Sequence, residues 1–514
     1  MFHFTVVFSL LIVLISGCSV NPVTGKREFT LVSEAQEISI GQKQYLPSRQ
    51  MQGGVYRVDP DLTRYVNQVG HRLAAVSDRK LPYEFVVLNN SVPNAWALPG
   101  GKIAVNRGLL LELGSEAELA AVLGHEIVHA AARHGAKGME RGMLLQGVIL
   151  ATGIAARDSD YANLAVGGAQ LAASLLNQKY GREAERQSDL YGTEYMKRAG
   201  YDPQAAVALQ ETFVRLSKDR KSNWFSGLFS SHPPSQERVE NNRATIQRLG
   251  AGGEMGKQRY LKKIARIRKT KPAYDAYDQG RKALAKNDFR KAFSLAKKAL
   301  AIEPQEGHFY ALRGDAFYTQ HRYRDALASY NRAVKLNSEF FHYFVQRGLT
   351  RQELGDALGA QIDLEKSTRL LPTATALNGL GELALQRRDR RSAVEYFRAA
   401  AGSKSDPGRK AARSLVLLDL PQNPGRYLKT RPGLNRSGYL MTEVANPTSV
   451  SVNRIELIIQ YPDESGRMRQ FSEYVHGTIP SGRTIRVKTR LGPIADRALL
   501  RNIRIIVSRA SIVN

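Results

Sequence analysis

Residues 124–135 have the sequence Gly-His-Glu-Ile-Val-His-Ala-Ala-Ala-Arg-His-Gly, which contains the His-Glu-x-x-His pattern of helical zinc sites at His125, Glu126 and His129. Positions four apart share one face of an α-helix, so both imidazoles can reach the same ion. Glu126 is the residue after His125 on the helix, and its carboxylate is expected beside the open coordination position, where it can take a proton from an attacking water. The pattern therefore predicts a catalytic site with one Zn2+ per chain. The alternative interpretation is a helix with two surface histidines.

The helix around this pattern is predicted to be long and mostly buried. Ser115 followed by Glu118 is a capping box that begins the helix, and Gly135 is placed to end it. A buried helix gives a metal site dry and fixed walls. The apolar positions that predict burial are Ala120, Ala121, Leu123, Ile127, Val128 and Ala131.

A catalytic zinc site needs a third protein ligand. One class uses the histidine of His-Glu-x-x-His-x-x-Gly-x-x-His, but here Ala132 stands at the glycine position and Gly135 at the histidine position, which excludes that class. His134 is nine residues beyond His125, about 180° round the helix. We expect it to be a C-terminal-turn histidine that the helix dipole favours, not a ligand.

Carboxylates of a later predicted helix, residues 180–199, can complete the site. Glu185 and Asp189 are four apart on one face, so one can bind the metal while the other orients a ligand histidine. Because Arg182 and Arg186 are close by, the alternative is that Glu185 is a solvated charge.

Composition and the start of the chain limit the possible partners. The chain has 514 residues, which predicts about two to four domains. With 75 Lys and Arg against 47 Asp and Glu, its formal charge of +28 would suggest nucleic acid in a cytosolic protein. Residues 5–16, however, form an apolar run too short to span a bilayer comfortably and typical of a signal peptide. We therefore expect no nucleic acid, and acidic proteins or anionic lipid surfaces as partners.

Cys18 is the only cysteine, so no disulfide can form within one chain. The preceding Ile15-Ser16-Gly17 resembles a bacterial lipoprotein signal, in which residues 1–17 are removed and Cys18 carries lipid. Ser19 resembles the outer-membrane sorting pattern, although no Lys or Arg precedes the apolar run. The resemblance implies a periplasmic protein anchored by lipid to the outer membrane. The alternative is an uncleaved membrane anchor.

Residues 270–420 contain a repeat. Gly280, Gly314 and Gly348 are 34 residues apart, and a fourth unit around Gly381 is one residue short. Small residues at fixed places let paired helices pack closely, and the period resembles the tetratricopeptide repeat. Four units suffice for a solenoid with a concave groove that binds peptides or proteins.

Two other regions are predicted to form strands. Residues 83–88 and 102–105 are short apolar strands, and residues 93–101 are expected to be a loop between them. At the C-terminus, Ile-, Val- and Tyr-rich runs separated by turns predict a small β-sandwich at residues 427–514. The predicted strands of this sandwich cover residues 450–461, 468–474, 484–490 and 503–507.

The chain resembles the M48 (Ste24-like) metallopeptidases, a gluzincin family, and especially its envelope members with a C-terminal tetratricopeptide array. The matching stretches within residues 20–250 are Asn94-Ala95-Trp96-Ala97-Leu98-Pro99-Gly100-Gly101, His125–His129, Arg182-Glu183-x-Glu185-x-x-Ser188-Asp189 and Ser231-His232-Pro233. The family pattern Glu-x-x-Ala-Asp implies that Glu185 is the third zinc ligand and that Asp189 supports a ligand from behind. Ser188 replaces the usual alanine.

We expect a multidomain fold class. The resemblance implies an α+β gluzincin-type metalloprotease domain at residues 18–265 and an all-α tetratricopeptide solenoid at 270–420, and the strand patterns predict a small all-β sandwich at 427–514. The resemblance does not extend to the β-rich C-terminus.

Two further assignments rest on the resemblance. His232 is expected to face the zinc, either as a donor to the oxyanion or as a fourth ligand that closes the site; the alternative is a histidine packed under a turn. Lys102, Ile103, Ala104 and Val105 resemble the edge strand along which such peptidases bind an extended substrate.

The resemblance also implies a function. We expect a zinc-dependent endopeptidase of the cell envelope that cleaves misfolded or stalled outer-membrane or periplasmic proteins. Expected partners are unfolded or misassembled envelope proteins, the outer-membrane assembly machinery through the repeats, and the membrane through the lipid anchor. The alternative is a chaperone-like scaffold in which proteolysis is secondary.

Overall fold

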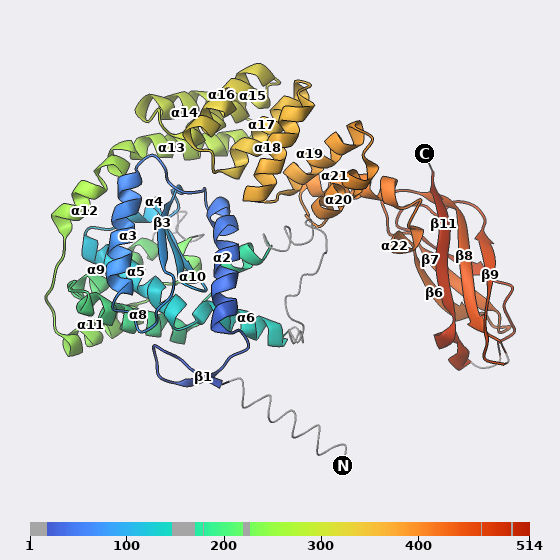
Figure 1. Cartoon of the computed structure of the whole chain (residues 1–514), viewed down its shortest axis with the longest axis horizontal. Coiled ribbons are helices and arrows are strands. Elements are labelled where there is room, and N and C mark those ends of the chain that lie inside the picture. Colours follow the sequence, from blue (N-terminus) through green and yellow to red (C-terminus); the bar gives the residue numbers. More distant parts are fainter. Residues whose placement is uncertain are drawn as a thin grey trace, which may run out of the picture. The chain divides into compact units, whose positions relative to one another are not determined.

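The computed structural model describes residues 18–145, 170–177, 179–218, 227–463, 465–494 and 497–513. The chain divides into two compact units, of which the first ends at Pro372 and the second begins at Thr373 (Figure 1). The predicted signal peptide at residues 1–17 lies outside the described residues. Within the described part, none of the helices combines the length and the apolar character that crossing a membrane requires.

A three-stranded mixed sheet supports the first unit. Its order is β3-β5-β4, with β3 (Glu84–Leu88) parallel and β4 (Ala95–Leu98) antiparallel to the central strand β5 (Lys102–Asn106). The prediction of a loop at residues 93–101 is therefore wrong in part. All four residues of β4 are buried, and the left-handed backbone of Gly100 and Gly101, with φ of 76° and 84°, turns the chain back to form the hairpin.

The position of β5 corrects a predicted site. Both edges of this strand are hydrogen-bonded, to β3 and to β4, so the backbone of Lys102, Ile103, Ala104 and Val105 cannot pair with a substrate. Lys102 is also buried, and its Nζ donates to the carbonyl of Pro82. Among the described residues, no strand pairs with the other edge of β4.

Helices cover both faces of the sheet. One face, with Phe85 and Ile103, packs into a core shared with α3 (Pro60–Ala74) and α5 (Glu116–Ala131). The opposite face, which includes Trp96, packs against α2 (Glu34–Met51). Every residue of β4 and β5 is buried for this reason, as is usual for a sheet between two helical layers.

The helix with the His-Glu-x-x-His pattern ends earlier than Gly135. Its last residue is Ala131, Arg133 adopts φ of 63°, and a new helix, α6 (His134–Leu145), begins at His134. The left-handed backbone at Arg133 is costly for a non-glycine residue. Its buried guanidinium, however, pairs with the buried carboxylate of Glu37 from α2, with Nε 3.0 Å from Oε2.

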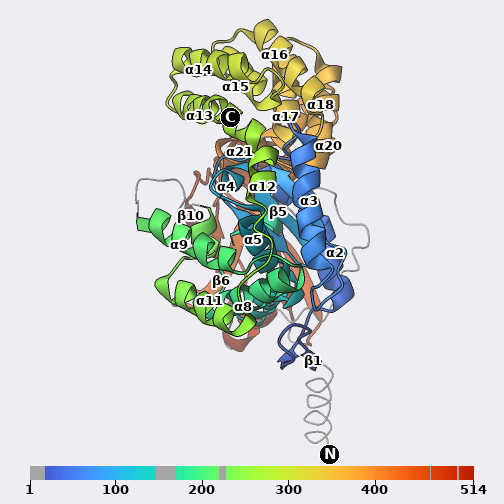
Figure 2. The same ribbon diagram turned by 90° about the vertical axis from the view of Figure 1, so that its left-hand side faces the viewer.

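A second helix, α8 (Arg182–Arg198), crosses α5 at two glycines. A Cβ atom on Gly124 would lie 3.0 Å from the carbonyl oxygen of Gly192, and one on Gly192 would lie 2.9 Å from the backbone nitrogen of His125. The two backbones can approach this closely only because neither residue has a side chain. Figure 2 shows α8, α9 and α11 grouped beside α5, away from α2 and α3.

Shorter elements complete this part of the chain. Near its start β1 and β2 form an antiparallel pair, and α4 and α9 to α12 are helices. Their bounds are β1 (Cys18–Val20), β2 (Arg27–Phe29), α4 (Arg107–Leu110), α9 (Gln204–Lys218), α10 (Leu228–Ser231), α11 (Gln236–Leu249) and α12 (Lys257–Lys263).

The repeat region consists of antiparallel helix pairs, as the 34-residue period predicts. A Cβ atom on Gly280, Gly314, Gly348 or Gly381 would lie within 3 Å of an apolar or aromatic side chain of a neighbouring helix, so these glycines permit the close packing of the pairs. The pairs are α13 (Ala265–Ala285) with α14 (Phe289–Ile302), α15 (Gly307–Tyr318) with α16 (Tyr323–Leu336), α17 (Phe341–Glu353) with α18 (Ala357–Leu370), and α19 (Ala374–Gln386) with α20 (Arg390–Ala401). The fourth pair belongs to the second unit, with α21 (Asp406–Asp419) and α22 (Pro424–Tyr427).

The first repeats pack directly on the sheet domain. The guanidinium carbon of Arg107 lies 3.4 Å from the centre of the Tyr274 ring, and His308 Nε2 lies 3.0 Å from the carbonyl oxygen of Gly53. Asn89 donates to the buried carboxylate of Glu306 at 2.8 Å. Part of the repeat surface is thus occupied by the chain itself.

The C-terminal strands form the predicted sandwich. Two three-stranded antiparallel sheets, β10-β7-β6 and β11-β8-β9, share an apolar core to which Val444, Leu457 and Val507 contribute. Strands β6 and β7 were not predicted from the sequence. The strands are β6 (Lys429–Leu434), β7 (Leu440–Ala445), β8 (Val452–Pro462), β9 (Met468–Val475), β10 (Thr484–Lys488) and β11 (Arg504–Ile512).

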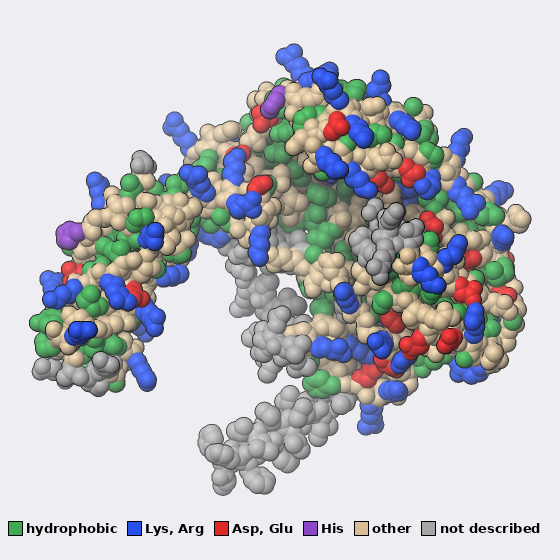
Figure 3. Space-filling model, turned by 180° about the vertical axis from the view of Figure 1, so that it is seen from behind, with side chains coloured by type: hydrophobic (Ala, Val, Ile, Leu, Met, Phe, Trp, Pro, Cys, Tyr) green, Lys and Arg blue, Asp and Glu red, His purple; other side chains and the backbone are tan. Residues whose placement is uncertain are grey.

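Positive charge is distributed over the surface. On the face seen in Figure 3, Lys and Arg side chains are scattered, with Asp and Glu side chains among them. On that face the described Lys and Arg side chains do not form a single basic groove of the kind that holds nucleic acid.

The close crossing of α5 and α8 yields a first prediction. Gly192→Ala should lower the free energy of unfolding by about 1–3 kcal/mol, because its Cβ would push against the backbone of α5. Urea unfolding followed by tryptophan fluorescence measures this, because Trp96 of β4 belongs to the same unit as the crossing.

Gly142→Ala is the matched control. Gly142 lies in α6, where an added Cβ would meet nothing within 4 Å, so this variant should be at least as stable as the native chain. Equal stability of the two variants would contradict the proposed constraint.

Candidate metal centre

Four side chains converge above α5. His125 and His129 come from successive turns of α5, Glu185 from the first turn of α8, and His232 from the residue that follows α10. One potential ligand atom from each lies within 4.8 Å of all the others. The structure therefore brings together the predicted ligands and His232, although more than 100 residues separate the first from the last.

The spacing of these atoms suits a small tetrahedral ion. His125 Nε2 lies 3.0 Å from His129 Nε2 and 3.2 Å from His232 Nδ1. Glu185 Oε1 lies 3.0 Å from His232 Nδ1 and 3.4 Å from His129 Nε2. Ligands at the usual zinc distances of about 2.0–2.1 Å are separated by about 3.3–3.4 Å along the edges of a tetrahedron.

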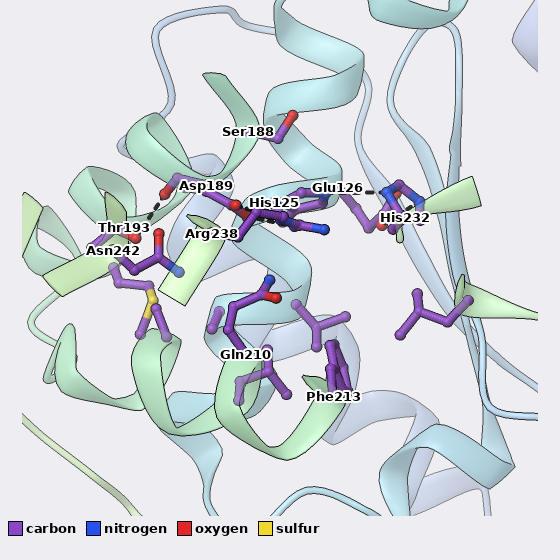
Figure 4. Close-up of a pocket in the computed structure, with 17 residues that line it drawn as sticks. His125, Glu126, Ser188, Asp189, Thr193, Gln210, Phe213, His232, Arg238 and Asn242 are labelled. Carbon is purple, nitrogen blue, oxygen red and sulfur yellow. Dashed lines mark hydrogen bonds and ion pairs between the residues drawn. The ribbon is translucent and has the colours of Figure 1, made fainter. Parts of the chain in front are cut away.

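Asp189 and Arg238 support two of these side chains. Asp189 Oδ1 lies 3.0 Å from His125 Nδ1, on the far side of the ring from the other ligands. Arg238 of α11 donates from Nε and Nη2 to the two oxygens of Asp189, each at 2.7 Å, and its Nη1 lies 3.0 Å from Glu185 Oε2. Figure 4 shows Asp189 and Arg238 together beside His125. Arg238 was not predicted as a site residue, since nothing in its local sequence marks it.

His134 supports the second histidine. Its Nδ1 lies 3.0 Å from His129 Nδ1, and its Nε2 lies 3.0 Å from Gln187 Oε1. It is not among the four converging side chains, as expected. The expected position in the last turn of the helix is wrong, because α5 ends at Ala131 and the turn at Arg133 swings His134 behind His129.

The electrostatics of the site favour a cation. Burial alone would lower the pKa of His125, but Asp189 and Glu185 raise it to about 9. The pKa of Glu185 itself is well below its usual value despite burial, mainly because His232 and His125 face it. Carboxylates that favour a proton on His125 would favour a divalent cation in the same place.

Burial dominates the pKa shifts of His129, His134 and Glu126. It lowers the pKa of His129 well below its usual value and that of His134 to about 4, so both rings are held neutral, and a neutral imidazole is the form that binds metal. It raises the pKa of Glu126, whose carboxylate is almost fully buried. A carboxylate with a raised pKa is suited to accept and return a proton.

Two buried carboxylate oxygens, one of Glu126 and one of Glu185, fit a site for a metal ion. Among the described residues, no hydrogen-bond donor of good geometry meets Glu126 Oε2 or Glu185 Oε2. Arg238 Nη1 is near the second of these, but the angle is poor. Buried polar atoms are normally satisfied, so the two atoms fit a site that holds an ion and an attacking water. The donor set of imidazoles and a carboxylate is one that zinc prefers.

A small cavity opens beside the site. Its volume is about 40 Å³, and it lies between α5, α8, α9 and α11 (Figure 4). Glu126 and His232 line one side of it, and Leu209 and Phe213 line the apolar end. A buried amide, Gln210, has no hydrogen-bond partner for its Oε1 among the described residues.

A His-Glu-x-x-His helix, a glutamate from a second helix and a buried carboxylate beside them define the active-site framework of zinc metallopeptidases. Residues 60–246 match the family described as Peptidase family M48. The part of the chain that matches peptidase family M48 holds the four converging side chains, Glu126 and the residues that support them.

Curated relatives resemble the same part of the chain. The putative beta-barrel assembly-enhancing protease of Vibrio cholerae serotype O1 is 33% identical over 192 residues, 36% of this chain and 39% of that protein. The beta-barrel assembly-enhancing protease of Escherichia coli K12 is 29% identical over 228 residues, 42% of this chain and 46% of that protein. The mitochondrial metalloendopeptidase OMA1 of Schizosaccharomyces pombe is 33% identical over 226 residues, 42% of this chain and 63% of that protein. The chain spans less than half the length of the first two.

Solved structures resemble smaller parts. The first TPR of Spaghetti (RPAP3) bound to an HSP90 peptide is 22% identical, with a TM-score of 0.23, over 23% of this chain and 98% of that one. MamA from Desulfovibrio magneticus RS-1 is 17% identical, with a TM-score of 0.26, over 29% of this chain and 84% of that one. The repeat fold is defined by the helix pairs described above.

The buried charges around Arg238 yield a second prediction. Arg238→Met should lower the free energy of unfolding by about 3–5 kcal/mol in the presence of a chelator, because it leaves Asp189 and Glu185 buried without their shared cation. Arg186→Met is the control, since Arg186 pairs with Glu237 on the surface, and it should cause no measurable change. Equal effects of the two substitutions in urea unfolding would contradict the assigned role.

Proposed function

We propose that this chain is a zinc metalloendopeptidase of the cell envelope, with His125, His129 and Glu185 as its zinc ligands. The observation that supports this most is the convergence of three imidazoles and one carboxylate at tetrahedral spacing beside the buried Glu126. A zinc ion at this place supplies Lewis-acid polarisation of the scissile carbonyl and of the attacking water.

The chain's own residues then move the proton. Glu126 receives the proton of the attacking water on its carboxylate and returns it to the leaving amine as the peptide bond breaks. Its burial raises its pKa and supports both steps. His125 is held in orientation by Asp189, so its Nε2 stays directed at the ion.

A single substitution tests this mechanism. Glu126→Gln should retain the zinc content and the fold but cleave casein about 10²–10⁴-fold more slowly, because the amide cannot accept the proton. Zinc content by atomic absorption and casein cleavage are measured on the same preparation. Near-native cleavage by the zinc-loaded variant would rule the mechanism out.

We propose that His232 is a fourth ligand that closes the site in this conformation. Its Nδ1 lies 3.2 Å from His125 Nε2 and 3.0 Å from Glu185 Oε1, which supports coordination over the alternative of donation to the oxyanion. The backbone of His232 bonds to Leu228, whose own nitrogen donates to the carbonyl of Pro93. Opening would thus move a short segment that is anchored next to β4.

The closed site predicts the behaviour of a His232 variant. His232→Ala should cleave a flexible protein such as casein severalfold faster, because a substrate carbonyl gains the fourth position. The double variant with Glu126→Gln is the control and should be inactive. An unchanged or lower rate for the single variant would contradict the closing role.

We propose that an extended substrate pairs with β4. This strand replaces β5 in that role, since it has one free edge within the described part of the chain. Gly135, at the start of α6, packs against Pro99 just after β4, so the strand lies near the helix that follows the metal ligands. Backbone pairing requires no particular substrate sequence.

We propose that the clients are unfolded or misassembled outer-membrane or periplasmic proteins, and that Cys18 carries a lipid anchor to the outer membrane. The support comes from residues 5–18 and from relatives named beta-barrel assembly-enhancing protease. The repeats would select clients or contact the assembly machinery through the surface that the sheet domain leaves uncovered. We also propose the domain limits that the sequence predicts, residues 18–265, 270–420 and 427–514, with the signal peptide at 1–17.

The second candidate function is a chaperone-like scaffold that uses the repeats and the sandwich. It is favoured by the fact that the repeats and the sandwich make up a large share of the chain, and that their described residues contain no further group of potential metal ligands. Complementation of a deletion strain with Glu126→Gln separates the two functions. Full rescue would favour the scaffold.

A further inference from the structure

His129 and His134 form an unusual pair of histidines behind the metal centre. The two Nδ1 atoms lie 3.0 Å apart, and the rings meet edge to face, with centroids 4.9 Å apart and planes at 76°. Both side chains are at most 5% exposed. His129 Nε2 points the other way, into the group of four ligand atoms.

We infer that His134 is a positioning residue that fixes the tautomer and orientation of His129 by accepting a hydrogen bond from its Nδ1–H. The inference rests on the proposed zinc site. A neutral imidazole that binds an ion through Nε2 carries its proton on Nδ1, and that proton needs an acceptor. The only nitrogen that meets His129 Nδ1 in the described hydrogen bonds is His134 Nδ1.

The remaining contacts complete a consistent chain of donors and acceptors. Because His134 accepts at Nδ1, its proton must be on Nε2, from which it donates to Gln187 Oε1 at 3.0 Å. The Gln187 amide, oriented in this way, donates from Nε2 to Glu183 Oε1 at 3.0 Å. One direction of donation therefore satisfies every group from the metal ligand to the protein surface.

The support of His129 by a neutral histidine differs from the support of the other ligand histidine, His125. His125 is supported by the carboxylate of Asp189, whose charge Arg238 balances. A neutral imidazole behind His129 supplies the same geometric constraint without a third carboxylate next to Glu185. This explains why His134 is buried although it binds no ion itself.

Ser188 is a second group that could donate to His134. Its Oγ lies 3.5 Å from His134 Nδ1, at the limit of a hydrogen bond. If the serine were the donor that matters, loss of its hydroxyl would disturb the pair. Ser188→Ala is therefore included in the experiment, and we expect it to bind zinc like the native chain.

The test compares two substitutions of His134 in the full chain. Asn places Oδ1 where Nδ1 of histidine lies and keeps the acceptor, whereas Leu removes it. Zinc affinity is measured by competition with a chelator, and the visible absorption spectrum of the Co2+-loaded protein reports the ligand geometry. Thermal unfolding in the presence of chelator verifies that each variant is folded.

We expect His134→Leu to bind zinc about 10–100-fold more weakly and to alter the Co2+ spectrum. His134→Asn should stay close to the native chain in both measurements. Gln187→Met, at a partly exposed position, should weaken binding to a smaller extent, because it frees the tautomer of His134 without removing the acceptor.

Three results would overturn the inference. They are native zinc affinity and an unchanged Co2+ spectrum in folded His134→Leu, equal losses in His134→Leu and His134→Asn, or a loss in Ser188→Ala that matches the loss in His134→Leu. If the native chain binds no zinc at all, the proposed function fails instead, so the two failures are distinguishable.

Discussion

The site depends on one close contact, the crossing of α5 and α8 at Gly124 and Gly192. Each glycine leaves the other backbone room that a single methyl group would fill. The crossing brings Asp189 and Glu185 of α8 against the histidines of α5, and the ligand set requires both helices. Backbone contact of this kind is rigid, since it cannot be relieved by the rotation of a side chain. A metal centre built on it keeps its geometry before any ion or substrate binds.

The buried carboxylates of the site need nearby positive charges or hydrogen-bond donors to balance them. Asp189 and Glu185 share Arg238, and Asp189 also holds His125. Burial alone would raise the pKa of Asp189, yet Arg238 and His125 hold it below its usual value. A third acid behind His129 would add negative charge close to Glu185, and the neutral His134 stands there instead. The charge balance of the site thus determines which kind of residue can support each ligand.

The repeats and the M48 domain are linked by contacts within the same unit. Arg107 stacks on Tyr274, and Glu306 accepts a hydrogen bond from Asn89, so the first repeats act partly as structural support for the sheet domain. This limits how freely the first two helix pairs can serve as a binding groove. The glycine and alanine spacing that predicts the repeats describes how each pair packs internally. It carries no information on which surface of the array is already covered.

Local periodicity by itself determined the metal-binding helix, the repeat helices and two of the ligands, His125 and His129. The spacing of His125, Glu126 and His129 shows that they share a helix face, and the 34-residue period shows the paired helices, because both follow from neighbours along the chain. Only the tertiary structure decided that β5 is central, because strand order depends on the hairpin at Gly100 and Gly101. It also decided that α5 ends before Arg133, whose guanidinium pairs with a glutamate 96 residues away. The roles of Arg238 and His134 arise in the same way, since buried partners distant in sequence leave no local pattern.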